Sequence, residues 1–306
     1  MTDDAAWQSG DRIFGDWGTT RLRLFRLRDD AVVDQQDGPG IGTLNGAPGD
    51  ALRATLEPWR AQGMSGGHVW LCGMVGSRNG IAEVPYAECP VDVTGWRTQT
   101  RIVTLDDVTV GIAPGLACTG PDGADDVMRG EETQIFGAMA LDPALAIGRH
   151  AVALPGTHGK WALIEDGHVV RFRTFLTGEL FALLRDRSTL TRAGDDDGDG
   201  DAGFAAGLVR SDAGGMLGAL FEARSAQLRK GRSRGWAVGF LSGLAIGHEV
   251  REALDTIVGV DSLTLVGDPV LARLYHQALA RHDRGVTVRD GSEAALAGLR
   301  LLAEQA

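Results

Sequence analysis

The two halves of this 306-residue sequence begin with the same layout, which restricts the fold more than any other feature. In the first half a short strand over residues 12–16 leads through a Gly-Thr turn into a returning strand over 21–27, where arginines alternate with apolar residues. Alternation with a period of two is typical of a strand with one buried face and one charged face. In the second half, strands over 151–154 and 160–164 flank another Gly-Thr turn. We therefore expect an antiparallel hairpin at the start of each half.

Each half then continues as alternating strands and helices. In the first half we expect further strands at 30–36, 68–74, 101–105 and 108–112, and helices at 51–62 and 131–141. In the second half we expect a strand at 168–174, helices from 178 to 258 with an acidic loop between them, and then a strand, helix, strand and helix at 262–267, 269–282, 286–289 and 292–305. This order predicts two related α/β domains that face a common cleft.

Charge and cysteine content limit the partners and the compartment. The net charge of −11 argues against general binding to the phosphates of nucleic acid. The three cysteines show no CxxC spacing, so neither a disulfide framework nor a thiolate zinc site is expected. The acidic N-terminus does not resemble a secretory signal, and the longest nearly apolar run, residues 236–247, is too short to span a bilayer. We expect a cytoplasmic protein with no membrane partner.

The first Gly-Thr turn, residues 16–20 (DWGTT), is the strongest chemical motif. Glycine lets backbone amides approach an anion, and threonine adds a hydroxyl donor. Asp16, at the end of the preceding strand, is of the type that holds magnesium. The alternative is an ordinary hairpin turn, where glycine and threonine are common.

The second turn, residues 155–160 (PGTHGK), has two glycines, a threonine and a lysine, as a loop around a β- or γ-phosphate requires. It is not a Walker A loop, because Leu154 stands where that motif has glycine and Trp161 where it has Ser or Thr. Each turn is a weak signal alone, but two at equivalent points of two half-chains are moderately specific.

Three further segments carry candidate groups. Residues 129–134 (RGEETQ) place two carboxylates at the start of a helix. They either stabilise the helix by interacting with its dipole, or supply a general base or a metal ligand. In the second case, Arg129 would bind an anionic substrate. In residues 73–78 (GMVGSR), Arg78 could receive a carboxylate. Residues 265–268 (LVGD) form a strand-to-helix turn that suits adenine or ribose but is common elsewhere.

Several familiar motifs are not supported. The acidic run 195–200 imitates the start of an EF-hand loop, but its twelfth position is Ala206 instead of glutamate, so a solvated loop is expected. No HExxH-like histidine spacing supports zinc, and no GxSxG nucleophile elbow occurs. The run 203–230 is rich in small residues, which we interpret as a sign of helix packing in preference to an oligomer surface. The sequence does not reveal the oligomeric state.

Together, the order of these motifs resembles the sugar kinase/actin/Hsp70 superfamily, and within it the 2-dehydro-3-deoxygalactonokinase family. The match is carried by DWGTTRLR (16–23), CGMVGSR (72–78), VMRGEETQIFGA (127–138), LPGTHGKW (154–161), FRTFLTGELFALL (172–184) and FLSGLAIGHEV (240–250). The resemblance implies two RNase H-like domains, 1–148 and 149–306, around a nucleotide and substrate cleft, with the last helix a candidate to pack back on the first domain. It also implies ATP- and Mg²⁺-dependent phosphorylation of 2-dehydro-3-deoxy-D-galactonate on its 6-hydroxyl, in galactonate catabolism.

The resemblance also implies roles for single residues. Asp16 would orient magnesium, and Glu131 would be the base, with Glu132 as the alternative. The remaining expected contacts are, for the nucleotide, Gly18, Thr19, Thr20, Gly156, Thr157, His158, Lys160 and Gly267, and for the sugar acid, Ser77, Arg78 and Arg129. The family has Gly-Glu-Glu at a place where many related sugar kinases have Gly-Asp. The sequence therefore does not decide which of the two glutamates is the base.

Three other functions remain as alternatives. One is a kinase for another sugar acid such as 2-dehydro-3-deoxygluconate, because a single sequence does not separate epimers. A second is a sugar or nucleotide sensor without catalysis, which the intact carboxylates and both phosphate turns disfavour. A third is an ATPase that clamps proteins, but no additional substrate-binding domain is recognised in this sequence.

Overall fold

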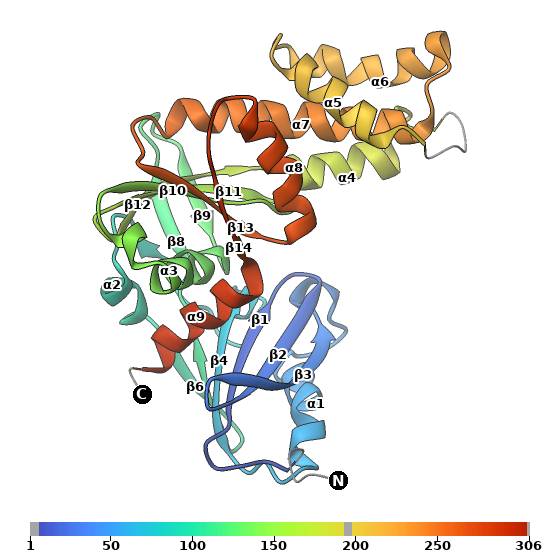
Figure 1. Cartoon of the computed structure of the whole chain (residues 1–306). Helices are drawn as coiled ribbons and strands as arrows, with labels where there is room; N and C mark the ends of the chain where they lie inside the picture. Colours follow the sequence, from blue (N-terminus) through green and yellow to red (C-terminus); the bar gives the residue numbers. More distant parts are fainter. Residues whose placement is uncertain (1–5, 193–197, 305–306) are drawn as a thin grey trace. The chain divides into compact units, whose positions relative to one another are not determined.

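The computed structural model describes residues 6–192 and 198–304, and these divide into two compact units. The first unit comprises Met1–Gly148, Ile164–Arg171 and Gly291–Ala306, and the second comprises Arg149–Leu163 and Phe172–Asp290. Figure 1 shows the elements of both units coloured along the chain. The acidic run predicted at 195–200 begins with three aspartates that lie outside the described residues.

The first unit is built on a six-stranded mixed sheet. Its strand order is β3-β2-β1-β4-β7-β6, with bounds β1 (Arg12–Trp17), β2 (Arg21–Arg28), β3 (Ala31–Pro39), β4 (Gly67–Gly73), β6 (Arg101–Leu105) and β7 (Val108–Ile112). β1 pairs antiparallel with β2 and parallel with β4. A separate three-stranded sheet has the order β5-β8-β9, from β5 (Ala87–Glu88), β8 (Leu116–Thr119) and β9 (Asp125–Met128).

Four α-helices of the first unit accompany these sheets: α1 (Pro48–Arg60), α2 (Val93–Arg97), α3 (Glu131–Leu141) and α9 (Gly291–Ala303). The last helix, α9, packs against α3, β1 and β4 and lies beside α3 in Figure 1. Glycines permit this close approach, because a Cβ built on Gly137 would lie 1.8 Å from the carbonyl oxygen of Ala294. The C-terminal helix α9 thus belongs to the first unit, although it is separated in sequence from the rest of that unit by the second unit.

A five-stranded sheet of order β12-β11-β10-β13-β14 underlies the second unit, although residues 164–171, at the end of β11 and the start of β12, are counted with the first. Its strands are β10 (Arg149–Leu154), β11 (Gly159–Glu165), β12 (His168–Phe175), β13 (Ser262–Gly267) and β14 (Thr287–Asp290). β10 pairs parallel with β13, which pairs parallel with β14. The order of these five strands repeats that of β3-β2-β1-β4-β7 in the first unit. The repeated opening seen in the sequence therefore extends to all five strands of this sheet, and β6 of the first unit has no counterpart.

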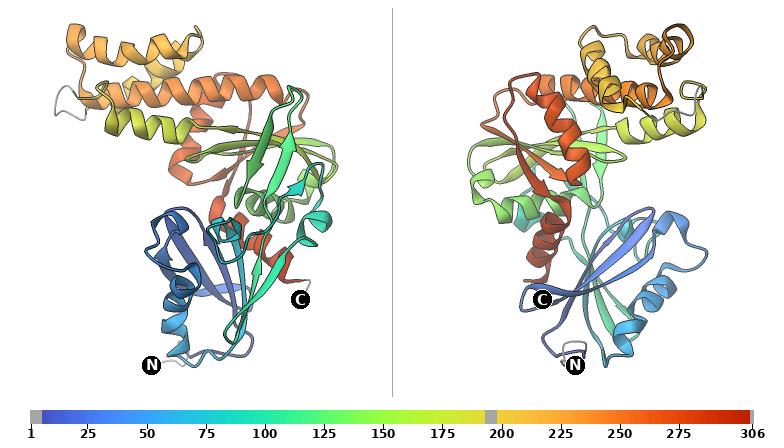
Figure 2. Two further views of the ribbon diagram at one scale, coloured as in Figure 1. Left: turned by 180° about the vertical axis from the view of Figure 1, so that it is seen from behind. Right: turned by 45° about the vertical axis from the view of Figure 1, so that its right-hand side comes forward.

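Helices make up much of the second unit: α4 (Thr177–Arg187), α5 (Gly200–Ser211), α6 (Met216–Lys230), α7 (Arg234–Thr256) and α8 (Pro269–Ala280). Both views of Figure 2 show α5 and α6 on one side of the long helix α7 and α4 on the other. Glycines of both helices make the contact of α5 with α7. A Cβ on Gly203 would lie 2.0 Å from the Trp236 carbonyl oxygen, and one on Gly243 would lie 2.1 Å from that of Phe204. The small residues expected to serve packing do so in α5.

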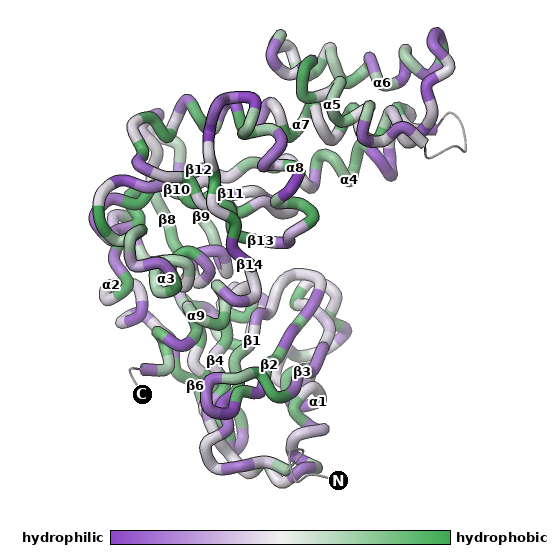
Figure 3. Tube along the Cα trace, viewed as in Figure 1, coloured by the Kyte–Doolittle hydropathy of each residue, from purple (hydrophilic) through white to green (hydrophobic). Residues whose placement is uncertain are grey.

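The hydrophobic pattern explains why the strands form where they do. The predicted alternation holds over the first half of β2 (Figure 3), where Leu22 and Leu24 are fully buried and Arg21 is exposed. From Phe25 to Leu27 every residue is buried, including Arg26, which pairs with the buried side chain of Asp11, so the prediction of one wholly charged face was wrong there. The strands β6, β7 and β13 and helix α3 have the predicted bounds. Most other predicted elements differ from the structure by one to three residues at an end. For example, Asp30 lies in the turn before β3, with φ 65°, and α1 ends at Arg60 ahead of the left-handed Gly63. Among the described residues no helix is both long and apolar enough to cross a membrane.

Candidate active site

Asp16 lies near the end of β1, next to the first Gly-Thr turn. Its Oδ2 accepts a hydrogen bond of 2.6 Å from Nη2 of Arg23, its direct neighbour across the β1–β2 ladder. The turn is held by backbone hydrogen bonds from Gly18 to Arg21 and from Gly42 to Thr19. Thr19 and Thr20 are exposed, and within the described part of the chain neither hydroxyl has a hydrogen-bond partner. The turn thus presents free hydroxyl donors beside a carboxylate.

Two glycines bring the Glu131–Glu132 segment to the end of β1. Gly73 ends β4 with φ 89°, and a Cβ on it would lie 2.7 Å from the Trp17 carbonyl oxygen and 3.4 Å from Oδ1 of Asp16. Gly130, with φ 111°, precedes α3, and a Cβ on it would lie 3.3 Å from Cα of Gly73. Both backbones require glycine, since L side chains rarely adopt such positive φ values. The predicted metal ligand and the predicted base therefore belong to one part of the first unit.

The two glutamates at the start of α3 differ in environment. Glu132 is fully buried, and its carboxylate accepts hydrogen bonds from the Gly130 N–H at 2.6 Å and the Thr133 hydroxyl at 3.0 Å. Burial, with the neighbouring charge of Glu131, raises the pKa of Glu132 to about 8. Glu131 is half-buried, and its Oε2 accepts a hydrogen bond of 3.2 Å from the Arg129 N–H. At neutral pH Glu132 is mostly protonated, which is unsuitable for a base.

The candidate substrate groups Ser77, Arg78 and Arg129 are of two kinds. Arg78 is exposed and its Nε lies 3.1 Å from Oε1 of Glu83. Arg129 is packed: Nη2 donates to the Val84 carbonyl at 2.7 Å, and the guanidinium lies 4.4 Å from the Tyr86 ring centroid. Its Nε and Nη1, and the Ser77 Oγ, are buried without a hydrogen-bond partner. No carboxylate among the described residues pairs with Arg129, so Arg129 and Ser77 retain donors for an anion.

The second Gly-Thr loop joins β10 to β11 and is braced by the start of α4. The Glu179 N–H donates to the Thr157 carbonyl at 2.9 Å, and Oε2 of Glu179 lies 2.5 Å from Nε2 of His158. Lys160 is 4% exposed, and its ammonium donates to the His158 carbonyl at 2.9 Å. A Cβ on Gly156 would meet no heavy atom within 4 Å. The loop is therefore rigidly supported and open at Gly156.

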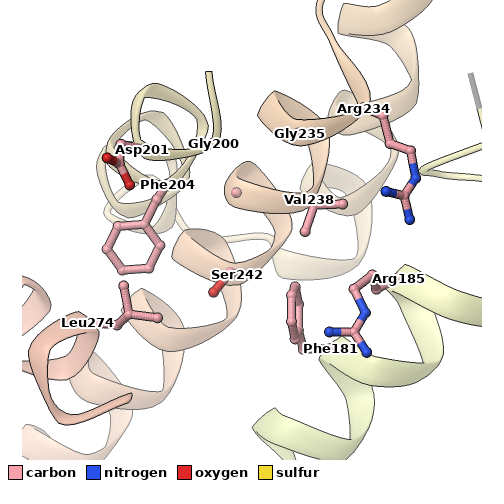
Figure 4. Close-up of a pocket in the computed structure, with 11 residues that line it drawn as sticks. Phe181, Arg185, Gly200, Asp201, Phe204, Arg234, Gly235, Val238, Ser242 and Leu274 are labelled. Carbon is pink, nitrogen blue, oxygen red and sulfur yellow. The ribbon is translucent and has the colours of Figure 1, made fainter. Parts of the chain in front are cut away.

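Two adjoining cavities extend from this loop among the helices of the second unit. A cavity of about 100 Å³ is lined by Gly156, Thr177, Gly178, Phe181, Ser242, Ala245, Ile246, Leu271, Leu274 and Tyr275. A larger cavity of about 460 Å³ shares Phe181, Ser242 and Leu274 with it. Figure 4 shows Phe181 and Arg185 projecting from α4 and Ser242 and Val238 from α7 around the larger cavity. Apolar walls with a few polar groups, next to a loop with an open glycine, suit a nucleoside.

Gly267, predicted near the adenosine, ends β13 with φ 155°. A Cβ on it would lie 3.5 Å from the Pro155 carbonyl oxygen, at the base of the second loop. It lines neither cavity, although Leu271, Leu274 and Tyr275 of the following helix do. Among the described residues, no group of three or more histidines, cysteines, aspartates or glutamates could hold a metal ion.

Comparison with known proteins decides between the functional classes. Residues 16–302 match the model of the family described as 2-keto-3-deoxy-galactonokinase. The chain belongs to this family. It is 34% identical over 291 residues to the 2-dehydro-3-deoxygalactonokinase of Escherichia coli (strain K12), with 94% of this chain and 96% of the relative covered. As a member of the 2-keto-3-deoxy-galactonokinase family it is a kinase, a phosphotransferase that uses ATP and acts on a small sugar acid.

Solved structures agree with this assignment. A crystal structure from Sinorhizobium meliloti, named for the same enzyme, matches with a TM-score of 0.86 at 33% identity and covers 96% of each chain. Acetate kinase from Entamoeba histolytica matches with a TM-score of 0.50 at 8% identity, covering 96% of this chain and 98% of that one, which bears on the fold alone. The predicted fold class, an α/β actin-like ATPase fold with mixed sheets, is confirmed for this galactonokinase family member.

The structure also places next to the candidate site residues that sequence reasoning did not assign. Arg23 was noted only as part of a charged strand face, and its role beside Asp16 depends on the β1–β2 register. Thr177, Phe181, Ser242 and Tyr275 come from three helices, and only the folded chain brings them together. The FRTFLTGELFALL and FLSGLAIGHEV blocks of the family match, which contain three of the four, were the available signal.

Proposed function

We propose that the chain transfers the γ-phosphoryl group of ATP to the 6-hydroxyl of 2-dehydro-3-deoxy-D-galactonate. The product would be 2-dehydro-3-deoxy-6-phosphogalactonate, in galactonate catabolism. The observation that carries this proposal is the approach of Gly130 to Gly73, which gathers Asp16, the two glutamates of α3 and the unpaired donors of Arg129 in the first unit. The name of the E. coli relative supports the choice of sugar acid.

The nucleotide is assigned to the two Gly-Thr turns and to the cavities of the second unit. Gly18, Thr19 and Thr20, together with Gly156, Thr157, His158 and Lys160, would bind phosphate oxygens through backbone amides, hydroxyls and the lysine charge. The adenosine would occupy the cavities that share Phe181, Ser242 and Leu274, with Gly267 at the base of the second loop. The open space at Gly156 is the feature of the loop that supports this assignment.

Asp16 is the residue proposed to hold Mg²⁺. Magnesium in kinases is commonly held by one or two carboxylates together with phosphate oxygens, so a site with few protein carboxylates fits it. When bound, the ion neutralises charge on the phosphates. Arg23, 2.6 Å from Asp16, would fix the orientation of that carboxylate.

We assign the base to Glu131 and keep Glu132 as the alternative. Phosphoryl transfer depends mainly on positioning and charge neutralisation, so a base contributes about 10²- to 10⁴-fold. Glu131 is half-buried and reachable, whereas Glu132 is buried with a pKa of about 8. Glu131→Gln should lower kcat with little change in KM, and kcat loss in Glu132→Gln alone would reverse the assignment.

The substrate carboxylate is assigned to Arg129 and Ser77. Their buried donors lack protein partners, and a charge-assisted contact with a carboxylate would satisfy them. The position of phosphorylation is tested by ³¹P–¹H correlation NMR of the product formed from 2-dehydro-3-deoxygalactonate. Coupling of phosphorus to the two C6 protons is expected, and coupling to any other carbon's proton would contradict the proposed 6-hydroxyl.

A further inference from the structure

Glu249 is a buried carboxylate that no proposed step uses. It lies in α7 with 3% of its surface exposed. Its Oε1 accepts a hydrogen bond of 2.8 Å from the Trp161 indole N–H, and its Oε2 accepts one of 2.6 Å from the Tyr275 hydroxyl. The Thr177 side chain is a third hydrogen-bond partner. No cation among the described residues pairs with it, so three neutral donors hold the carboxylate.

These three donors come from three different elements. Trp161 is on β11, Thr177 is the first residue of α4, and Tyr275 is on α8. A buried carboxylate is costly unless hydrogen bonds compensate it, and burial raises the pKa of Glu249 while the three donors lower it. A carboxylate joining β11, α4 and α8 to α7 fixes the spacing of these elements.

Two of the three donors lead directly to the nucleotide cavity. Thr177 and Tyr275 line the 100 Å³ cavity, which Gly156 of the second loop also lines. The start of α4 rests on this loop, since a Cβ on Gly178 would lie 2.2 Å from the Gly156 carbonyl oxygen. On the other side, a Cβ on Gly159 would lie 2.8 Å from Oε1 of Glu249. Glu249 therefore contacts the second Gly-Thr loop at Gly159 and reaches Gly156 of the same loop through Thr177 and the start of α4.

We infer that Glu249 is a positioning residue for the nucleotide: its carboxylate holds α4, α8 and the second Gly-Thr loop in the arrangement that ADP and ATP bind. The inference rests on the proposed assignment of ATP to this cavity. It goes beyond that assignment because Glu249 itself lines neither cavity and acts through Thr177, Tyr275 and Trp161.

The test compares Glu249→Gln with the wild type in the full-length enzyme. Glutamine keeps the volume but removes the negative charge, and its NH₂ group can be met only by a hydroxyl that turns from donating to accepting. We expect the Kd for ADP, measured by titration calorimetry, and the KM for ATP to rise about tenfold or more, because hydrogen bonds to a charged group are the strong ones. The KM for the sugar acid should stay within about twofold, since that site lies in the other unit.

Ser211→Ala is the matched control. Ser211 is buried in the same unit and its hydroxyl donates to the Leu208 carbonyl at 2.7 Å, but it lines neither cavity. It should lower the melting temperature without changing the Kd for ADP. Trp161→Phe, which removes one donor to Glu249 without touching a cavity, supplies a second variant if Glu249→Gln does not fold.

The outcomes distinguish failure of the positioning role of Glu249 from failure of the assignment of the nucleotide to this cavity. A folded Glu249→Gln or Trp161→Phe with wild-type Kd and KM for the nucleotide would overturn the inference and leave Glu249 a stabilising residue only. Equal rises in the KM values for ATP and for the sugar acid would overturn it too. Failure of the wild type to bind ADP would instead refute the nucleotide assignment on which the inference rests.

Discussion

Arg23 and Asp16 face each other across the β1–β2 ladder, with 2.6 Å between Nη2 of the arginine and Oδ2 of the aspartate. Both are partly buried, with side-chain exposures of 32% and 24%. The alternating pattern of β2 places Arg23 on the same face as Asp16, and the hairpin register brings them opposite. The pair therefore orients the carboxylate that we assign to magnesium before any ligand arrives.

The first prediction concerns this pair. Arg23→Gln should lower kcat/KM about tenfold, because groups that orient a metal-binding carboxylate typically contribute this much. Arg21→Gln is the control: Arg21 lies two residues away on the same strand, is exposed, and pairs with Asp37. Steady-state assays at varied Mg²⁺ measure both. Equal activity of the two variants would show that the Arg23–Asp16 contact does not matter for catalysis.

The second prediction concerns the sugar-acid carboxylate. Arg129→Gln should raise the KM for the sugar acid about 10- to 100-fold, the range expected for a charge-assisted hydrogen bond. Ser77→Ala should raise it less, because it removes a neutral donor. Arg78→Gln, at the exposed neighbour that pairs with Glu83, should leave KM unchanged. If Arg78→Gln gives the large effect instead, the carboxylate is bound at the surface loop.

The third prediction is a pH dependence of stability. Glu132 has a folded-state pKa of about 8, above its ordinary value of 4.5. Its protonated form is therefore favoured by folding, and this contribution is full below pH 4.5 and lost as the pH rises through 8. Glutamine cannot ionise, so the melting temperature of Glu132→Gln should gain at least ~2 °C relative to the wild type between pH 5 and pH 9.

Differential scanning calorimetry at pH 5, 7 and 9 measures this difference. Burial is the larger cause of the raised pKa and the charge of Glu131 the next. Glu131→Gln should therefore weaken the pH dependence of wild-type stability without abolishing it. Parallel curves of melting temperature against pH for the wild type and Glu132→Gln would contradict the buried, protonated state of Glu132.

The fourth prediction uses the open space at Gly156. The new methyl group of Gly156→Ala meets no protein atom within 4 Å, so the melting temperature should not change. Because the space is assigned to ATP, KM for ATP should rise about tenfold or more. Gly178→Ala offers a contrast, since its Cβ would lie 2.2 Å from the Gly156 carbonyl oxygen and should destabilise the protein. An unchanged KM in Gly156→Ala would exclude the nucleotide from this position.

Sequence patterns predicted most of the elements but not the small sheet of the first unit. Strands with clear alternation or buried runs, such as β6, β7 and β13, have the predicted bounds. β8 and β9 were missed, because each is four residues long and β9 begins with two aspartates. Their pairing, which extends from Leu116 with Met128 to Thr119 with Asp125, is visible only in the folded chain.

The candidate site was predictable only where the signal is local. The turns at Gly18 and Gly156 are short sequence motifs, and the structure places hydroxyl donors and open space there. The approach of Gly73 to Gly130 joins segments far apart in sequence, and nothing in either glycine alone indicates it. Nor could the sequence distinguish Arg78 from Arg129 as the substrate ligand, because the two arginines differ only in their burial and their partners in the folded chain.

The most direct test of the central claim is coupled ADP release with Mg²⁺-ATP against both 2-dehydro-3-deoxy epimers, other aldonates and hexoses. We predict turnover with 2-dehydro-3-deoxygalactonate, little with the gluconate epimer, and a loss of at least about 100-fold in Asp16→Asn. Preferred turnover of another acid would contradict the assigned substrate. Nucleotide binding without turnover of any compound would contradict the proposed kinase reaction and favour a sensor.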